Sequence, residues 1–378
     1  MSDTSRVAIV MSRMPRLVTP DAHWLRGLRA GLRRIHDRQQ ILWISPGTAG
    51  SDFVLRGAQR IGVVTELVTG SDAPNRDREL IQQVAEVLVL GVRPRGTIHQ
   101  LLLERLQGGP GRVVLIDLPD LQPPGVRQEL LELGATLWAP DWELMRPFDE
   151  WLQEWDTGDR CDQAVADSIL QLAALPRDEL VPYLTHTTRA CPGPWPRQTQ
   201  DDYLDSVLDG SPTADHSALH TLLRIVKQRR LIGSARMIRG GYPCVSFTAA
   251  PVRELPGLRC FRTHRARWDF EPFAISIRRD VLERRGVRPA IYGGENTWAG
   301  LTEPERPYFQ LSGDQEEAGS DVQHHDWSVE REWRHRGDLD LSDLTCDELI
   351  VLVPTVAAAR QLQPHSPWPI TLWPGDVT

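Results

Sequence analysis

The sequence predicts an α/β protein of two domains, in which a parallel sheet covered by helices precedes an α+β domain. Short apolar runs alternate with amphipathic stretches up to about residue 140. Beyond about residue 180 this alternation stops, and arginines and prolines become frequent. At 378 residues the chain is long enough for two domains, each with its own core.

Five apolar runs are predicted to be the strands of the first domain, because uninterrupted apolar runs are typical of strands buried on both faces. They are Arg6–Met11, Ile41–Ile44, Val63–Val68, Glu86–Gly91 and Arg112–Asp117. Between them, apolar residues at spacings of three and four predict helices. The expected helices cover residues 24–35, 53–61, 77–85, 96–107 and 124–133.

A glycine-containing loop, residues 46–51, follows the second predicted strand. Ligands of parallel sheets bind at the carboxyl ends of the strands, where glycines and a helix N-terminus can accept a phosphate. The predicted nucleotide-binding residues are Gly47, Thr48, Gly50 and Ser51, joined by Arg93 from the loop after the fourth strand. The alternative is an ordinary turn in which Ser51 caps the following helix.

The segment from Ser45 to Asp52, with Ala58 and the run Arg60-Ile61-Gly62-Val63, resembles the Rossmann-type SLOG superfamily. That superfamily includes nucleotide sensors and nucleotide-cleaving enzymes. The resemblance implies a Rossmann-like nucleotide-binding domain over residues 1–140. Because the paired-glycine signature of the superfamily is absent, it implies a sensor or a substrate-recruiting domain rather than a catalytic one.

Residues 141–180 are predicted to form an amphipathic helical linker to a second domain, residues 181–378. The apolar residues of this linker are Trp142, Phe148, Trp151, Leu152, Trp155, Val165, Ile169 and Leu172.

The second domain contains two carboxylates, Glu330 and Glu332, in a run that extends from Trp327 to Arg334. If this run is a strand, both acids point to one face. Two acids side by side repel each other, and a low dielectric raises the pKa of at least one of them. This cost invites a functional explanation. The alternative is a solvated edge strand whose acids pair with Arg331 and Arg334.

Two further predicted strands carry polar residues. The first contains His186, Thr187 and Arg189, and the arginine is suited to hold a phosphate. The second, preceded by a helix, ends in Ser246-Phe247-Thr248. A lone histidine is usually structural, so His186 carries weight only together with the other motifs.

The order of these three motifs resembles the ADP-ribosyltransferase superfamily, including its DarT-type and abortive-infection-type members. The resemblance implies an α+β fold with NAD as cofactor. It implies that His186 contacts the ribose and Arg189 the pyrophosphate, and that the strand with Ser246, Phe247 and Thr248 supports the nicotinamide pocket. Thr187, in the motif of His186, is a further cofactor-binding residue. Glu332 would stabilise the positively charged sugar and orient the nucleophile, with Glu330 assisting. Which of the two acids is catalytic stays open.

Residues 222–288 carry a net charge of +11, so the rest of the chain carries −19. A basic segment in an acidic protein predicts an anionic partner such as a nucleotide or nucleic acid. The alternative is that it pairs with acids, among them Asp314, Glu316, Glu317 and Asp321.

Several classes are disfavoured. No apolar stretch approaches the roughly 20 residues of a membrane span. The five cysteines are scattered without a CxxC motif, and no signal peptide is evident, so we expect a cytoplasmic protein. No zinc-binding spacing occurs, and we expect His324-His325 to be solvated rather than to bind a metal.

We therefore expect an NAD-dependent ADP-ribosyltransferase-like enzyme, a toxin or anti-phage effector with a nucleotide-sensing first domain. The alternatives are an enzyme that hydrolyses NAD or a nucleoside N-glycosidic bond, and a non-enzymatic nucleotide- or nucleic-acid-binding module. The acceptor, whether protein, nucleic acid or water, and the oligomeric state stay open.

Overall fold

A computed structural model describes two compact units. The described residues are 6–374, except 13, 16, 49, 69–72, 149–171, 175–181, 237, 263–266 and 312–326. The first unit comprises residues 1–162 and 192–216, and the second comprises residues 163–191 and 217–378. Residues 192–216 thus group with the first unit, whereas the sequence-based boundaries placed them in the second domain.

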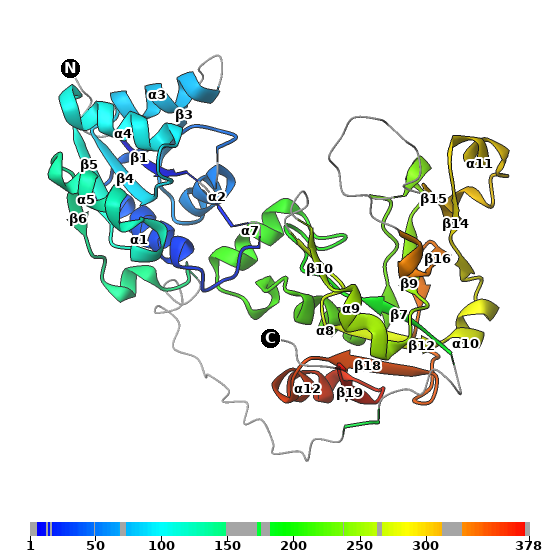
Figure 1. Ribbon diagram of the computed structural model, residues 1–378. Coiled ribbons are helices and arrows are strands. Elements are labelled where there is room, and N and C mark those ends of the chain that lie inside the picture. Colours follow the sequence, from blue (N-terminus) through cyan, green and yellow to red (C-terminus); the bar gives the residue numbers. More distant parts are fainter. Residues whose placement is uncertain are drawn as a thin grey trace. The chain divides into compact units, whose positions relative to one another are not determined.

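The first unit is built on a six-stranded parallel sheet, as the alternating pattern predicted (Figure 1). Its strand order is β3-β2-β1-β4-β5-β6. The strands are β1 Arg6–Met11, β2 Ile41–Ile44, β3 Thr65–Leu67, β4 Glu86–Gly91, β5 Arg112–Ile116 and β6 Thr136–Trp138. The sequence analysis missed β6, because this edge strand is three residues long and largely exposed. The arrangement is compatible with a Rossmann-like domain.

Helices cover both faces of this sheet. Val7 and Ile9 of β1 belong to one apolar cluster, together with side chains of α1, α2 and α7. Ala8 and Val10 belong to a second cluster, together with side chains of α4 and α5. A strand buried on both faces has no polar side, which explains its uninterrupted apolar sequence. The helices of this unit are α1 His23–Asp37, α2 Ser51–Arg60, α3 Ala73–Gln83, α4 Thr97–Gly108, α5 Pro124–Glu132 and α7 Gln200–Leu208.

Helix α7 is held on the first unit by apolar packing and by arginines. Tyr203 lies in the same apolar cluster as α1 and α2. The fully buried Arg29 of α1 donates from Nε to the carbonyl of Leu208 at 3.0 Å, at the helix C-terminus, where a cation is favoured. Arg56 of α2 donates from Nε to Asp205 of α7 at 2.7 Å.

The second unit contains a seven-stranded mixed sheet of order β13-β16-β9-β7-β12-β18-β19. Its strands are β7 Tyr183–Thr187, β9 Cys244–Thr248, β12 Ala274–Arg278, β13 Arg288–Pro289, β16 Glu332–Arg336, β18 Leu349–Val353 and β19 Ile370–Leu372. Neighbouring strands are antiparallel except β18 and β19, which are parallel.

Short elements surround this sheet. Three small strand pairs are β8 Arg230–Leu231 with β17 Leu339–Asp340, β10 Cys260–Arg262 with β11 Arg267–Asp269, and β14 Ile291–Gly293 with β15 Phe309–Leu311. The helices are α8 Ala218–Gln228, α9 Leu255–Leu258, α10 Arg279–Arg284, α11 Glu295–Gly300 and α12 Val356–Leu362. The largest apolar cluster of this unit contains residues of α8, α10 and α12 and of the central strands.

Most of the predicted helical linker lies outside the described residues. At its start, Trp142–Met145 forms a 3₁₀ turn. Near its end, Leu172 forms an isolated parallel bridge with Ile370, so the expected helical position of Leu172 is wrong. The helical spacing of the apolar residues predicted a helix at Leu172, but its backbone instead pairs with β19. No helix in the described part of the chain is long and apolar enough to cross a bilayer.

Asp205→Asn is expected to destabilise the protein by about 1.5 kcal/mol at pH 7, the typical contribution of a hydrogen bond to a charged group. The Arg56 hydrogen bond lowers the pKa of Asp205. A lowered folded-state pKa stabilises the protein above the unfolded-state pKa of about 3.9, and this stabilisation is lost as the pH falls through the folded-state value.

Urea unfolding followed by circular dichroism at pH 7 and at about pH 3 measures both effects. Asp201→Asn is the control, because Asp201 contacts Arg56 at 3.2 Å from an exposed position and should change stability by less than about 0.5 kcal/mol. Equal effects of the two substitutions would contradict the predicted role of Asp205.

Candidate active site

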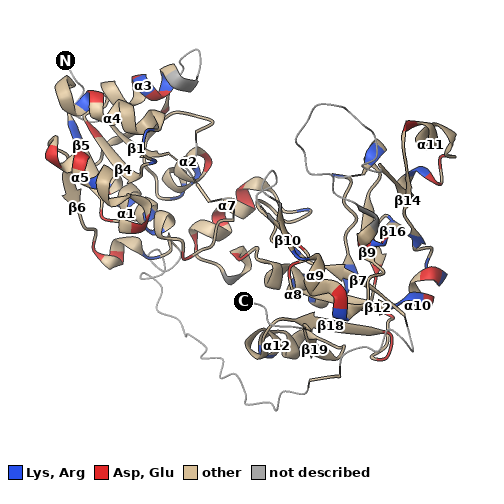
Figure 2. Ribbon diagram, in the orientation of Figure 1, with Lys and Arg blue, Asp and Glu red and all other residues tan. Residues whose placement is uncertain are grey.

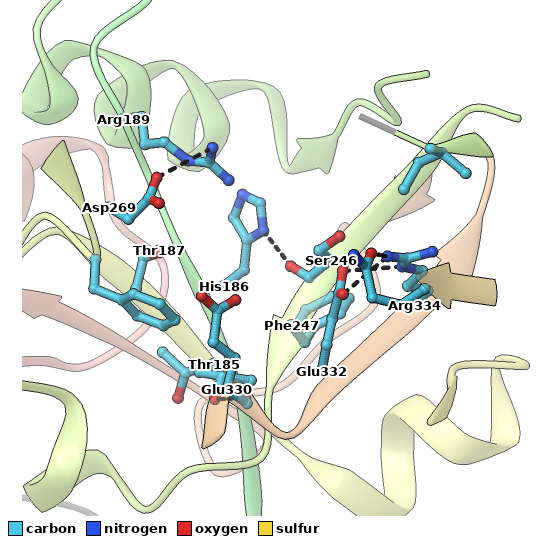
Figure 3. A pocket seen from close by; sticks show the side chains of 14 residues that line it. Thr185, His186, Thr187, Arg189, Ser246, Phe247, Asp269, Glu330, Glu332 and Arg334 are labelled. Carbon is cyan, nitrogen blue, oxygen red and sulfur yellow. Dashed lines mark hydrogen bonds and ion pairs between the residues drawn. The ribbon is translucent and has the colours of Figure 1, made fainter. Parts of the chain in front are cut away.

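A cavity in the second unit lies where β7 and β9 diverge (Figure 3). These strands pair only through Thr185 and Thr248, whereas β9 and β16 pair over five residues. The cavity encloses about 850 Å³, including solvent at its mouth. Its lining residues are Thr185, His186, Thr187, Arg189, Ile238, Ser246, Phe247, Thr248, Asp269, Phe270, Gln310, Glu330, Glu332 and Arg334.

All eight site residues predicted for the second domain therefore line one cavity. They come from β7, β9 and β16 and from the residues that directly follow or precede these strands. The three motifs are far apart in the sequence, and the neighbouring positions of their strands in the sheet bring them together. Their roles in binding and catalysis stay predictions.

The carboxylate of Glu332 is fixed by Arg334, two residues later on the same face of β16. The guanidinium donates from Nε to Oε1 and from a terminal nitrogen to Oε2, each at 2.9 Å. Arg334 is 1% exposed and also donates to the carbonyls of Pro307 and Phe309 and to Gln310 Oε1. A carboxylate offers about four lone-pair positions, so this fork leaves positions for a ligand.

Glu330 lies in the same cavity, but not in the strand. Trp327–Glu330 forms a 3₁₀ turn, and Arg331 has φ of +45° before β16 begins at Glu332. The prediction that one strand face carries both acids is therefore wrong. The left-handed conformation of Arg331 interrupts the extended backbone, so Glu330 and Glu332 are not alternate residues of one strand. Both side chains still line the cavity. The Thr248 hydroxyl donates to the Glu330 carbonyl at 2.5 Å and so fixes this turn.

His186 forms part of the cavity wall between β7 and β9. Its Nδ1 lies 2.8 Å from the carbonyl of Ser246, which can only accept, so Nδ1 carries the proton. Burial lowers the pKa of His186 to about 4, and the Ser246 carbonyl offsets this only in part. The imidazole is therefore neutral near pH 7, and Nε2 is a hydrogen-bond acceptor, suited to a ligand hydroxyl.

The predicted cofactor-binding residues of β9 serve structural roles as well. Phe247 is 3% exposed, and its ring contacts that of His186 at a centroid distance of 5.8 Å. The Thr248 hydroxyl also accepts from the Ala250 amide at 3.0 Å. Because its hydroxyl is bonded to both Glu330 and Ala250, Thr248 holds the cavity wall in shape and is less available to bind a ligand.

Arg189 lies on the opposite side of the cavity from Glu332, with His186 between them (Figure 3). Its guanidinium pairs with Asp269 at 3.8 Å and is 41% exposed, so it is accessible to an anion. Asp269 is followed by Phe270, which lines the cavity with φ of +56°. A left-handed non-glycine residue is strained and persists only where its surroundings enforce it.

Sequence reasoning missed several cavity residues, notably Arg334, Asp269, Phe270 and Gln310. Arg334 was recognised only as a partner for the acids, although its position two residues after Glu332 places both on one face. The other three lie on short segments whose sequences carry no signal that would bring them to this cavity.

The predicted nucleotide-binding residues of the first unit follow β2 and β4, the two neighbours of β1 in the sheet. Arg93 lines a cavity at the carboxyl ends of β1 and β4, together with Ser12, Gly91 and Asp120. This is the point where the strand order reverses, the usual ligand position in such sheets. Gly50 lines a small apolar cavity. Arg93 and Gly50 thus line different cavities, and the convergence of Arg93 with the 46–51 loop stays a prediction.

The 46–51 loop is closed by its own hydrogen bonds. The Ser51 hydroxyl accepts from the Gly47 amide at 3.2 Å, and the Thr48 hydroxyl donates to the Ser45 carbonyl at 2.9 Å. Gly47 has φ of +79°, which glycine adopts without strain. These bonds favour the interpretation as a turn, although Gly50, not Ser51, is the helix N-cap.

Several arginines of the basic segment pair with nearby acids. Figure 2 marks both kinds of residue on the ribbon. On α10, Arg279 pairs with Glu283 and Arg284 with Asp280. Arg239 pairs with Glu295, and Arg285 with Asp343. Glu283 and Asp280 are already counted in the net charge of the segment, so only the pairs with Glu295 and Asp343 support the alternative that acids outside it neutralise its charge. Asp314, Glu316, Glu317 and Asp321 lie outside the described residues, as do His324 and His325.

Comparison with known proteins finds little similarity. No family model and no curated protein match the chain. One solved structure similar to part of it is DNA processing protein A (DprA) from Streptococcus pneumoniae. The two share 16% identity and a TM-score of 0.26, over 36% of this chain and 58% of that chain. This likeness is too weak to support an argument about function.

Glu332→Gln is expected to lower stability more than Glu330→Gln, because it leaves the buried Arg334 guanidinium without its negative partner. Removing one member of a buried ion pair costs about 3–5 kcal/mol. Thermal unfolding of the two variants tests this. Equal melting temperatures would mean that the Glu332–Arg334 pair contributes little to folding.

His186 is expected to titrate near pH 4 rather than near the ordinary value of 6.5. Protonation is then favoured in the unfolded chain, so stability is full above about pH 6.5 and falls toward pH 4. NMR of the imidazole resonances, assigned with His186→Gln, measures the titration. A midpoint near pH 6.5 would show that the ring is more hydrated than this geometry indicates.

Proposed function

We propose that the second unit cleaves the nicotinamide–ribose bond of NAD, as an ADP-ribosyltransferase-like enzyme. The observation that carries this proposal is one cavity lined by His186, Arg189, Glu330 and Glu332. These are the residue types that the resemblance to ADP-ribosyltransferases implies for ribose, pyrophosphate and catalysis. Their meeting in one cavity supports the proposal, and activity itself is open to experiment.

The chemistry requires a negative charge near a sugar that becomes positive. The bond between the anomeric carbon and the nicotinamide nitrogen breaks, and its electron pair leaves with nicotinamide. A fixed carboxylate stabilises the positive centre most strongly in the transition state. We assign this role to Glu332, because Arg334 fixes its orientation. The incoming nucleophile bonds to the anomeric carbon and releases its proton to Glu330.

The nucleophile decides between transfer and hydrolysis. A protein or nucleic-acid acceptor gives ADP-ribosylation, and water gives free ADP-ribose. We propose a toxin or anti-phage role in the cytoplasm on the resemblance alone. For the first unit we propose a nucleotide-sensing role at the cavity beside Arg93, supported by the position of this cavity at the strand-order reversal.

The wild type is expected to release nicotinamide from NAD, and Glu330→Gln and Glu332→Gln to do so at least about a hundredfold more slowly, the scale of losing a transition-state interaction. Mass spectrometry of nicotinamide and ADP-ribose, with and without cell lysate and added nucleotides, separates transfer, hydrolysis and activation. Glu283→Gln is the control, because this exposed acid pairs with Arg279 away from the cavity.

Glu330→Gln is the more informative variant, because it leaves the buried ion pair intact. Nicotinamide release by both variants at the wild-type rate would refute the proposed chemistry. Loss in Glu332→Gln alone, together with a large fall in melting temperature, would indicate unfolding rather than lost catalysis. Binding of a nucleic acid without any NAD cleavage would favour the non-enzymatic binding module.

A further inference from the structure

The two-stranded ribbon β10–β11 exposes an aromatic pair. Phe261 and Trp268 lie directly opposite each other in the antiparallel register. They are 49% and 41% exposed, and their ring centroids are 5.4 Å apart in an edge-to-face arrangement. Among the second-unit residues whose side chains the structure describes, no other aromatic side chain is this exposed. Exposing two large aromatic rings is unfavourable unless a partner covers them.

An arginine lies against this pair. The guanidinium carbon of Arg259 is 4.6 Å from the Trp268 ring centroid, a cation–π distance. Its buried Nε donates to no group among the described residues. The sequence from Pro251 to Trp268 contains five arginines and one acid, Glu254. The aromatic pair therefore lies in a positively charged segment, which complements a phosphorylated ligand.

The ribbon is continuous with the cavity wall. Asp269, which follows Trp268, lines the cavity and contacts Arg189. The next residue, Phe270, also lines the cavity and packs in a small apolar cluster with Leu255 and Trp373. This packing anchors the base of the ribbon. From Glu332 the cavity leads past His186 to Arg189 and Asp269 (Figure 3). Trp268 precedes Asp269 in β11 and lies outside the cavity lining, at its Arg189 end.

We propose that Trp268, supported by Phe261 and Arg259, stacks on the adenine base of the dinucleotide. This inference rests on the proposed cleavage of NAD. With the nicotinamide ribose at Glu332 and the pyrophosphate at Arg189, the adenosine half extends beyond Arg189 toward the ribbon. Base stacking on an aromatic face and a nearby guanidinium suit this half of the molecule. Trp268 thereby determines specificity for a dinucleotide over a mononucleotide.

Nicotinamide mononucleotide provides the test, because it contains the same glycosidic bond without the adenosine half. Nicotinamide release is measured for both substrates with the wild type, Trp268→Ala and Trp268→Phe. For Trp268→Ala we expect the KM for NAD to rise about tenfold, the scale of one lost stacking interaction. Its kcat for NAD, and both constants for the mononucleotide, should stay unchanged. Trp268→Phe should retain most of the affinity.

Trp142→Ala is the matched control, because Trp142 is an exposed tryptophan of the first unit that also lies against an arginine, Arg146. It should leave every constant unchanged. An unchanged KM for NAD in Trp268→Ala would overturn the inference, and so would equal wild-type preference for the two substrates. Both results leave the proposed cleavage intact, so the two failures are distinguishable.

If the wild type cleaves neither substrate, calorimetric binding of ADP-ribose decides the question. Binding by the wild type that weakens about tenfold in Trp268→Ala supports the stacking site even though the proposed reaction fails. No binding, or equal binding by both proteins, overturns it. Trp268-dependent binding of a single-stranded oligonucleotide without any effect on ADP-ribose or NAD would assign the ribbon to nucleic acid and likewise overturn it.

Discussion

The buried guanidinium of Arg334 joins the parts of the second unit that form the cavity. It binds both carboxylate oxygens of Glu332 on its own strand and the carbonyls of Pro307 and Phe309 on a separate segment. Burying a charge is costly unless every hydrogen-bonding group is satisfied, so such a network is stable only when complete. The orientation of Glu332 and the path of the 307–309 segment therefore depend on each other, and the fold and the site share this interaction.

Two residues around the cavity have strained backbone conformations. Phe270 and Arg331 both adopt left-handed backbone conformations, which cost a non-glycine residue about 1–2 kcal/mol. One lines the cavity, and the other separates its two acids. The hydrogen bond from Ala249 to the Arg331 carbonyl, at 3.0 Å, helps to hold one of these residues. Stable packing around the cavity thus maintains a geometry that the local sequence would not adopt alone.

The sequence predicted the features that depend on short-range pattern. Val87–Gly91 is apolar because β4 is buried on both faces, and the predicted bounds Glu86–Gly91 match β4. The grouping of His186, Ser246 and Glu332 was expected only because the order of their motifs resembles that of ADP-ribosyltransferases. The turn at Glu330 was not predictable, because an arginine with positive φ leaves no signal in the sequence.

The sequence also did not show which apolar core α7 packs against. The apolar face of α7, with Tyr203 and Val207, has the same helical spacing whichever core it covers. Its place in the first unit depends on partners such as Arg29 and Arg56, about 150 or more residues earlier in the chain.

The position of α7 affects how the protein can be divided. The chain changes unit three times, at residues 162, 191 and 216. A fragment that ends near residue 162 loses α7 and exposes the apolar surface beneath it, whereas a fragment that begins near residue 181 carries α7 without its core. The two units are thus interleaved, and neither can be exchanged between proteins as a simple terminal module. A fragment that keeps the apolar surface of the first unit covered therefore includes residues 192–216.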